Sequence, residues 1–299
     1  MVQVTPVQGD FVAVVDDVDL SHPLNDADFA DVEMAFETYG VIVFPAQNIT
    51  DDQQIAFSRR FGPLEPSVRR HRNRAVSNVF LSDISNVGSD GQIMAEKSEA
   101  MSYNRGNQLW HSDSSFKEIP SKASLLSARE VPPSGGETEF ADMRAAWDTL
   151  SAEKQAEISD LVAQHSLAYS RATIGYDAGE EFMDVEKSEV PPIPQPLIRV
   201  SPVTGRKSLY VGSHAAYVDG LDRDAGRTLL DGLLAHAAEA RFVYIHNWAA
   251  FDLVMWDNRC INHRGRPWQS QKHRRVMRRT TIGGDGFDEA AALAIGSTM

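Results

Sequence analysis

The amino-acid sequence predicts a mainly β protein, an antiparallel sandwich or jelly roll that carries helical insertions. Three observations support this fold class. Short β-type runs separated by turn residues recur after residue 75, few of them alternate with helices as parallel βαβ units would, and a 299-residue chain with 42% hydrophobic residues suits one large core. We therefore expect a single domain over residues 1–299.

The first elements are helical apart from one short strand. Residues 25–40 carry apolar residues at helical spacing and end at Gly40, and "VIVFP" at 41–45 predicts a buried strand stopped by proline. Thr50 is placed to cap a helix through "DDQQIAFSRRFG", which has acidic residues in its first turn and ends at Gly62.

Short strands and two helical regions fill the rest of the chain. The helices are expected at about 142–162 and 222–238. The strands are expected at 76–81, 123–131, 165–170, 196–200, 208–212, 241–248, 252–257 and 274–282.

Two long polar segments, 88–106 and 171–196, interrupt this pattern. Loops of this length inside a compact domain are usually functional, so both are expected beside an active site, and the first is expected to act as a lid. The last segment, 283–299, is expected to be a flexible tail or an oligomer contact.

Charge and composition exclude several classes of partner. A formal net charge of −13 argues against nucleic acid and anionic membranes, because both require a clustered positive field. The single cysteine, Cys260, allows no intrachain disulfide and favours a reducing compartment. The start of the chain has no basic leader, and no apolar run reaches membrane-spanning length. We expect a cytoplasmic protein, a homo-oligomer, with a small-molecule substrate.

The stretch "NQLWHSDSSF" at 107–116 contains the first candidate site residues. On an extended chain His111 and Asp113 project to the same side. Together with His263, which follows an apolar strand, they would form the two-histidine, one-carboxylate set that holds non-haem Fe(II) and leaves positions open for chemistry. The third ligand stays open at this point, because three other histidines lie in β-type runs: His165, His214 and His246.

The strand expected at 274–282 carries arginine on both faces. Alternation along the strand gives two sets of side chains, one with Arg274, Val276 and Arg278 and the other with Arg275, Met277 and Arg279. An inward arginine without a partner is costly, so we expect it to bind a carboxylate through its rigid fork. Two inward arginines beside an iron site predict two acidic small molecules. The alternative is an exposed edge strand protected by its charges.

At these residues the sequence resembles the Fe(II)/2-oxoglutarate-dependent taurine and 2,4-dichlorophenoxyacetate dioxygenase family, especially its phenoxyalkanoate members. The resemblance covers nearly the whole chain. It is carried in order by "VIVFPAQNITDDQQIAFSRRFGPLE", "NQLWHSDSSF", "VPPSGGETEFADMRAAWDTL", "WDNRCINHRGRPW" and "HRRVMRRTTI".

The resemblance implies a double-stranded β-helix core and a role for each matching residue. His111, Asp113 and His263 would bind iron. Arg274, eleven residues after His263, would bind the distal carboxylate of 2-oxoglutarate with help from Thr138, and Arg278 would receive the anionic head of the substrate. The resemblance also matches Asn107 and Trp256 to pocket-lining positions and His214 to a histidine that contacts the substrate in the phenoxyacetate enzymes.

The reaction implied by the resemblance uses Fe(II), O₂ and 2-oxoglutarate to hydroxylate the carbon beside the ether oxygen of an aryloxyacetate. The products would be a phenol, glyoxylate, succinate and CO₂. Because Asp113 is present where related halogenating enzymes have a small residue, oxygenation is favoured over halogenation. Four aromatic residues are available for an apolar slot: Phe116, Tyr169, Tyr217 and Trp268.

Two other functions stay open on the sequence. A relative that oxidises a sulfonate or sulfate ester could use Arg278 in the same way. A zinc hydrolase could use the same His, Asp and His with one bound water, but it gives the arginine pair no task.

Overall fold

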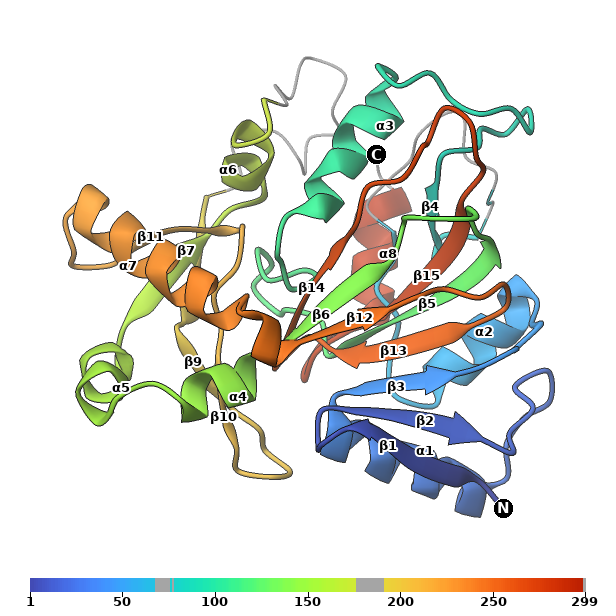
Figure 1. Ribbon diagram of the computed structural model, residues 1–299, viewed down its shortest axis with the longest axis horizontal. Coiled ribbons are helices and arrows are strands. Elements are labelled where there is room, and N and C mark those ends of the chain that lie inside the picture. The colour runs from blue at the N-terminus through green and yellow to red at the C-terminus, as the bar shows by residue number, and fades with distance from the viewer. Residues whose placement is uncertain (68–75, 77, 176–190, 298–299) are drawn as a thin grey trace.

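The computed structural model describes residues 1–67, 76, 78–175 and 191–297. Its centre is a seven-stranded sheet in the order β1-β2-β3-β13-β5-β15-β4, faced by a three-stranded sheet in the order β12-β6-β14. All pairings in these two sheets are antiparallel except that of β2 with β3. Helices α1 and α2 lie on the opposite side of the large sheet from β6, β12 and β14 (Figure 1).

The strands are short and are distributed over the whole chain. In chain order they are β1 Gln3–Gln8, β2 Val12–Asp16, β3 Val41–Phe44, β4 Ser82–Ser85, β5 Ala123–Glu130, β6 Thr138–Asp142, β7 Val162–His165, β8 Ile193–Pro196, β9 Ile198–Val200, β10 Lys207–Leu209, β11 Ala215–Val218, β12 Val243–His246, β13 Leu253–Asp257, β14 Ile261–Gly265 and β15 Val276–Ile282. The helices are α1 Asp26–Tyr39, α2 Asp51–Arg59, α3 Glu99–Asn104, α4 Met143–Asp148, α5 Ala152–Ile158, α6 Leu167–Ala172, α7 Arg223–Ala237 and α8 Glu289–Ser297, with 3₁₀ turns η1 Arg105–Gln108 and η2 Ala240–Phe242. The expectation of a mainly β chain with helical insertions is confirmed.

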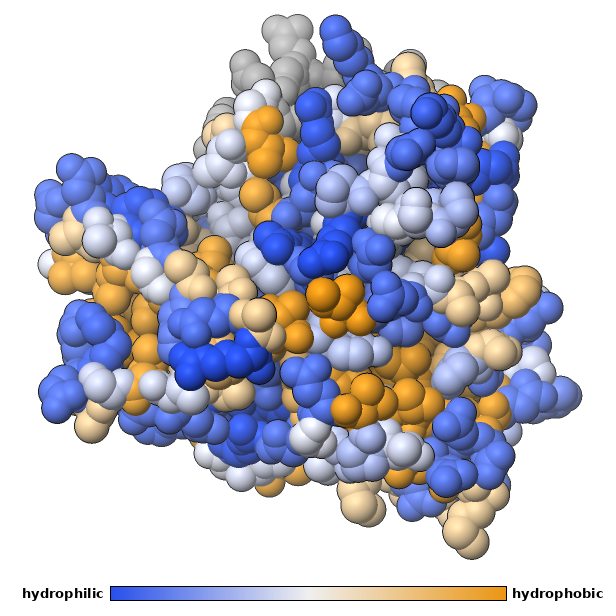
Figure 2. Space-filling model, in the orientation of Figure 1, coloured by the Kyte–Doolittle hydropathy of each residue, from blue (hydrophilic) through white to orange (hydrophobic). Residues whose placement is uncertain are grey.

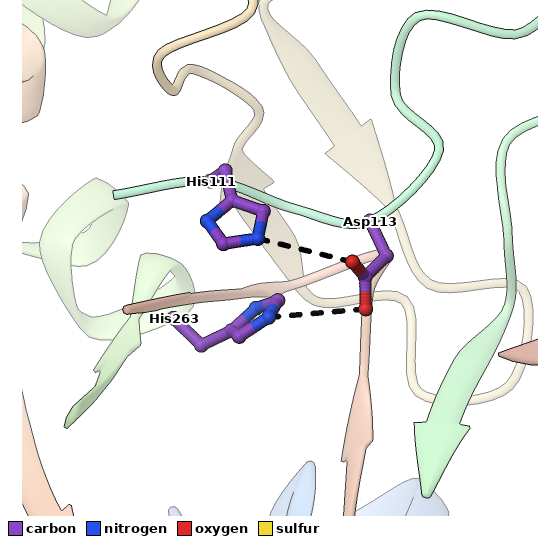
Figure 3. Close-up of side chains that lie close together, drawn as sticks. All are labelled: His111, Asp113 and His263. Atoms are coloured by element: carbon purple, nitrogen blue, oxygen red, sulfur yellow. Dashed lines mark ion pairs between the residues drawn. The ribbon is translucent and has the colours of Figure 1, made fainter. Parts of the chain in front are cut away.

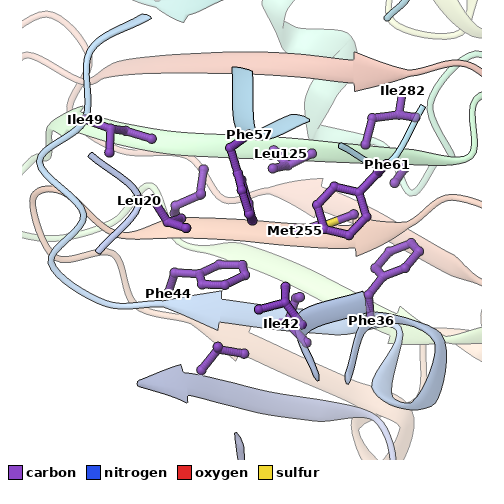
Figure 4. Close-up of a cluster of buried hydrophobic side chains, with 14 of the residues drawn as sticks. Leu20, Phe36, Ile42, Phe44, Ile49, Phe57, Phe61, Leu125, Met255 and Ile282 are labelled. Carbon is purple, nitrogen blue, oxygen red and sulfur yellow. The ribbon is translucent and has the colours of Figure 1, made fainter. Parts of the chain in front are cut away.

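The central strands β3, β13 and β5 of the large sheet are buried on both faces, and neighbouring residues of one strand enter different cores. On β13, Met255 packs with α1 and α2, whereas Val254 and Trp256 pack toward the three-stranded sheet. Phe57 and Phe61 from the α2 segment lie over Leu125 and Met255 in the first core (Figure 4). This two-residue alternation explains why the first four residues of β13, LVMW, form a continuous apolar run in the sequence.

Helix α2 begins where its sequence predicts. Thr50 accepts a hydrogen bond from the backbone N–H of Gln53, and the Gln53 side chain returns one to the backbone N–H of Thr50, which completes a capping box. Helix α1 is capped by Asn25 and ends at Gly40, whose φ of 78° suits glycine. Both helices are thereby confirmed.

Three of the expected elements differ from the structure. Residues 165–170 were expected as a strand, but α6 begins at Leu167 because the Ser166 side chain caps it. The described residues of 76–81 form no strand, and β4 follows them. The helical region at 142–162 is two helices, α4 and α5, with Ser151 capping the second.

A third cluster of buried side chains joins α4 and α7 to strands β7, β10 and β11, on the side of the molecule that Figure 1 shows at the left. Figure 2 shows hydrophilic residues over most of the viewed face, with hydrophobic residues in smaller groups between them. Of the helices that the structure describes, none has the length and apolar character needed to cross a membrane.

The segments expected as loops and tail have different structures. The 88–106 segment contains α3 and enters η1. Most of the 171–196 segment, residues 176–190, lies outside the described residues. Within 283–299, α8 contacts the rest of the fold at its first turn, where Glu289 pairs with Arg59 and accepts a hydrogen bond from the backbone N–H of Leu64; a flexible tail or an oligomer contact in this segment stays a prediction.

Candidate metal centre and its two pockets

Three side chains from distant parts of the sequence meet at the edge of the small sheet, beside β14. His263 lies on β14, and the extended residue His111 pairs with it through two backbone hydrogen bonds of 3.1 and 2.8 Å. Asp113 follows two residues later, and its carboxylate faces both imidazoles (Figure 3). One ligand atom from each residue lies within 4.8 Å of the others. Of the candidate histidines, the structure therefore joins His263 to the pair.

Both imidazoles are held neutral with nitrogen atoms aimed at the carboxylate. Burial lowers the pKa of His111 and lowers that of His263 further, against the opposing field of Asp113. The Nδ1 of His111 lies 2.7 Å from the carbonyl oxygen of Leu109, which only accepts, so this nitrogen carries the proton. The Nε2 lone pair of His111 is thereby left free toward Asp113.

Asp113 is ionised and fixed by donors on both oxygens. Burial alone would raise its pKa, but the Arg279 guanidinium and the two histidines outweigh burial, so the pKa lies well below its ordinary value of 3.8. Arg279 Nη1 donates to Oδ1 at 2.6 Å, and the Ser124 hydroxyl donates to Oδ2 at 2.7 Å. Asn258 supports the arrangement by donating to Ser124 and accepting from the backbone N–H of Asp113.

These donors fit a divalent transition metal. Each Nε2 lies 3.8 Å from an Asp113 oxygen, which is too far for a hydrogen bond and less than the roughly 4.2 Å between ligands on opposite sides of one ion, given metal–ligand distances of about 2.1 Å. Two neutral imidazoles and one carboxylate form the facial set of non-haem Fe(II) sites.

A cavity of about 320 Å³ opens beside the two histidines. Arg275 lines it and is 6% exposed, and its Nε donates to the Gly136 carbonyl oxygen at 3.2 Å. Within the described part of the chain its guanidinium has no acidic partner. Burial lowers the pKa of Arg275 to about 10, with a small opposing effect from Glu137, so it remains a cation at neutral pH. This cavity can therefore bind an anion.

The predicted orientation of Arg274 and Arg278 is wrong. Arg274 is on the surface, where it pairs with Glu130 and donates to the Gly91 carbonyl oxygen, and Arg278 pairs with Asp83 at 2.5 Å on the other face of β15. The inward arginines are their neighbours Arg275 and Arg279, twelve and sixteen residues after His263. A one-residue shift moves every side chain of a strand to the opposite face. Alternation along the sequence had already placed Arg275 and Arg279 together on one face of the expected strand, so the inward pair could have been found there.

A second cavity of about 70 Å³ is lined by His111 and Asp113 of the same cluster. His111, Asn107 and Arg279 line both cavities, whereas Asp113, Phe116, Arg171 and His214 line only the second. Arg171, from α6, was not identified from the sequence because its segment was taken for a strand and a loop.

The other predicted pocket residues divide between the two cavities. Thr138 and Trp256 line the larger one, and the ring centroids of Trp256 and His263 are 4.5 Å apart. His214 is buried in the smaller one, and its ring centroid is 4.9 Å from that of Phe116. Of the aromatic candidates, Phe116 and Trp268 line cavities, whereas neither cavity is lined by Tyr169 or Tyr217.

Two known proteins are similar to this chain over nearly its whole length. The α-ketoglutarate-dependent 2,4-dichlorophenoxyacetate dioxygenase of Cupriavidus pinatubonensis is 42% identical over 279 residues, which cover 93% of this chain and 96% of that protein. The (S)-phenoxypropionate/α-ketoglutarate dioxygenase of Sphingobium herbicidovorans is 38% identical and covers 96% of this chain and 97% of its own.

A solved structure is similar over the same range. The structure of AAD-2 in complex with Mn(II) and N-oxalylglycine has a TM-score of 0.89 and 46% identity, and covers 95% of this chain and 98% of that one. The family described as "Taurine catabolism dioxygenase TauD, TfdA family" matches residues 3–281, which confirms the resemblance found in the sequence. The chain is a member of the TauD/TfdA dioxygenase family.

Proposed function

We propose that this chain is an Fe(II)- and 2-oxoglutarate-dependent dioxygenase that hydroxylates the carbon next to the ether oxygen of an aryloxyalkanoate such as 2,4-dichlorophenoxyacetate. The observation that carries the proposal is the position of Arg275, a buried guanidinium without an acidic partner, in the cavity beside His111, Asp113 and His263. The 2,4-dichlorophenoxyacetate and phenoxypropionate dioxygenases are the relatives that supply the substrate class.

The metal would be held by His111, Asp113 and His263. The backbone pairing of His111 with His263 sets the distance between the imidazoles, and Ser124 with Arg279 fixes the carboxylate plane. Such supporting hydrogen bonds orient ligands and tune a bound metal. Because Arg279 neutralises Asp113, the pair keeps an ionised ligand stable inside the fold.

The cosubstrate would occupy the larger cavity with its distal carboxylate on Arg275. A carboxylate there would receive a charge-assisted, bidentate contact in a buried setting, where such contacts are strong. The Thr138 hydroxyl, which accepts a hydrogen bond from Trp248 at 3.0 Å, lines the same cavity and can donate to that carboxylate. We assign 2-oxoglutarate binding to Arg275 and Thr138 in place of Arg274.

When bound, ferrous iron with 2-oxoglutarate and O₂ would supply the oxidising power for hydroxylation. The residues of this chain contribute position and the exclusion of water. Trp256 and Leu126 give the larger cavity apolar walls, and Phe116 and His214 close the smaller one. Substrates that the protein holds in position react faster, because the reacting groups are already oriented before the chemical step. We also propose that the two facing sheets form a double-stranded β-helix core.

The decisive experiment supplies purified protein with Fe(II), 2-oxoglutarate, O₂ and 2,4-dichlorophenoxyacetate. We expect succinate and 2,4-dichlorophenol in equal amounts, with neither product when O₂ or 2-oxoglutarate is left out. Product release by the zinc-loaded protein without O₂ would show a hydrolase instead. Succinate formation with taurine or an alkyl sulfate, but not with aryloxyalkanoates, would show that the substrate class is wrong.

A further inference from the structure

Two of the buried arginines in the described part of the chain lack an acidic partner, and they line different cavities. The buried arginines are Arg144, Arg171 and Arg275. Arg144 is neutralised by Asp142 at 2.9 Å. Arg275 lines the larger cavity, which the proposed function gives to 2-oxoglutarate, and Arg171 lines the smaller one. A buried unpaired cation is costly, so each cavity is built to receive an anion.

Arg171 is held in one position by its neighbours. Its guanidinium carbon lies 4.3 Å from the centre of the Tyr103 ring, and its Nε is buried without a hydrogen-bond partner. A Cβ added at Gly106 would lie 1.8 Å from Arg171 Nη1, so the turn η1 packs directly on the guanidinium. The arginine fork is therefore positioned before any ligand arrives.

The charges around the smaller cavity leave one cation uncompensated. Glu65 pairs with Lys117 at 2.6 Å, and Asp113 pairs with Arg279 at 2.6 Å. Arg171 is the remaining charged residue of the described cavity lining. The whole chain has a formal net charge of −13, so the positive charge of this cavity lining is opposite in sign to that of the protein as a whole.

We propose that Arg171 is the residue that binds the carboxylate of the aryloxyalkanoate substrate, an inference that rests on the proposed function. In this substrate class the carboxylate is bonded to the carbon that is oxidised, so its receptor must share a cavity with the metal ligands. Arg171 meets this requirement, because its cavity is also lined by His111 and Asp113. Arg278, the residue first expected in this role, faces away, and Arg279 is already paired with Asp113.

The test compares Arg171→Gln with the wild type in two separate titrations. Anaerobic Fe(II) and 2-oxoglutarate give a visible chelate band that needs no substrate. Calorimetry with phenoxyacetate needs no turnover. We expect the chelate band and the 2-oxoglutarate Kd to be unchanged in Arg171→Gln, while the phenoxyacetate Kd rises at least about 30-fold, as for loss of one partner of a buried charge pair.

Two further variants and a neutral ligand complete the design. Arg171→Lys keeps the charge without the fork, so its loss of affinity should be smaller, and it replaces Arg171→Gln if that variant does not fold. Arg223→Gln removes the same charge from the exposed start of α7 and should bind phenoxyacetate as the wild type does. Phenoxyacetamide, which has no charge, should bind wild type and Arg171→Gln equally.

The outcomes separate this inference from the proposed function. Wild-type phenoxyacetate affinity in both Arg171 variants would overturn the assignment, and so would equal wild-type affinity for phenoxyacetate and phenoxyacetamide. Absence of the chelate band from the wild type would contradict the proposed function, and the calorimetric comparison would still show whether Arg171 binds the carboxylate.

Discussion

Replacement of Arg275 by glutamine should weaken 2-oxoglutarate binding and, at the same time, stabilise the protein without its ligands. The side chain is 6% exposed and has no acidic partner in the described residues, so its charge is compensated only when an anion enters the cavity. Loss of one partner of such a buried pair costs about 2–5 kcal/mol, which raises Kd at least about 30-fold.

The stability effect follows from the lowered pKa. Burial lowers the pKa of Arg275 from 12.5 to about 10, so the folded protein disfavours its cation at every pH below 10. A shift of this size corresponds to about 3 kcal/mol, because one pKa unit is 1.36 kcal/mol. Glutamine removes this penalty and can still donate to the Gly136 carbonyl oxygen, so we expect the free energy of unfolding of the ligand-free protein to rise by up to about 3 kcal/mol.

The neighbouring arginine provides a matched control. Arg274 lies on the surface and pairs with Glu130, so Arg274→Gln should leave 2-oxoglutarate binding and stability nearly unchanged. Anaerobic titration of the Fe(II) chelate band gives the Kd, and urea unfolding of the metal-free protein gives the stability. The reasoning is refuted if Arg274→Gln has the larger effect on Kd, or if Arg275→Gln destabilises the ligand-free protein.

Three further predictions concern the ligands and the buried histidines. His263→Ala should abolish Fe(II) binding measured by calorimetry, because two protein ligands remain; retained affinity would remove this residue from the site. Ser124→Ala should weaken Fe(II) binding about 10–100-fold, because Asp113 loses a donor to Oδ2, and an unchanged Kd would show that the hydroxyl is not needed. Burial lowers the pKa of His165 from 6.5 to about 3, so the unfolded state binds the extra proton in this window and stability falls as pH drops from 6.5 to 3. His165→Gln should reduce the slope of unfolding free energy against pH by up to about 1.4 kcal/mol per pH unit. An unchanged slope would contradict the lowered pKa of His165 in the folded protein.

The sequence predicted the parts of the fold that depend on local chemistry. Thr50 and Gly40 mark helix ends by their own side-chain and backbone preferences, and β13 is recognisable as an apolar run. The segment at 165–170 was predicted as a strand because its apolar residues are compatible with a strand or a helix. The Ser166 side chain caps a helix that begins at Leu167.

Some residues of the candidate site could be predicted from the sequence, and others depend on how the chain packs. The cluster of His111, Asp113 and His263 was predicted because their residue types and the resemblance to a family agree. The predicted pair, Arg274 and Arg278, differs by one residue from the pair that lines the cavity, Arg275 and Arg279. Counting along the connection from His263 to β15 does not reveal which neighbour points inward. Arg171 could not be predicted, because its position depends on how α6 packs on Tyr103 and Gly106.

The most direct test of the metal centre is a crystal structure of this protein with Mn(II) and N-oxalylglycine, recorded with anomalous scattering from manganese. We predict one manganese peak in contact with His111 Nε2, an Asp113 oxygen and His263 Nε2, with the distal carboxylate of the inhibitor on Arg275. A manganese peak elsewhere, or an inhibitor carboxylate bound by Arg274 while Arg275 stays unpaired, would contradict the account.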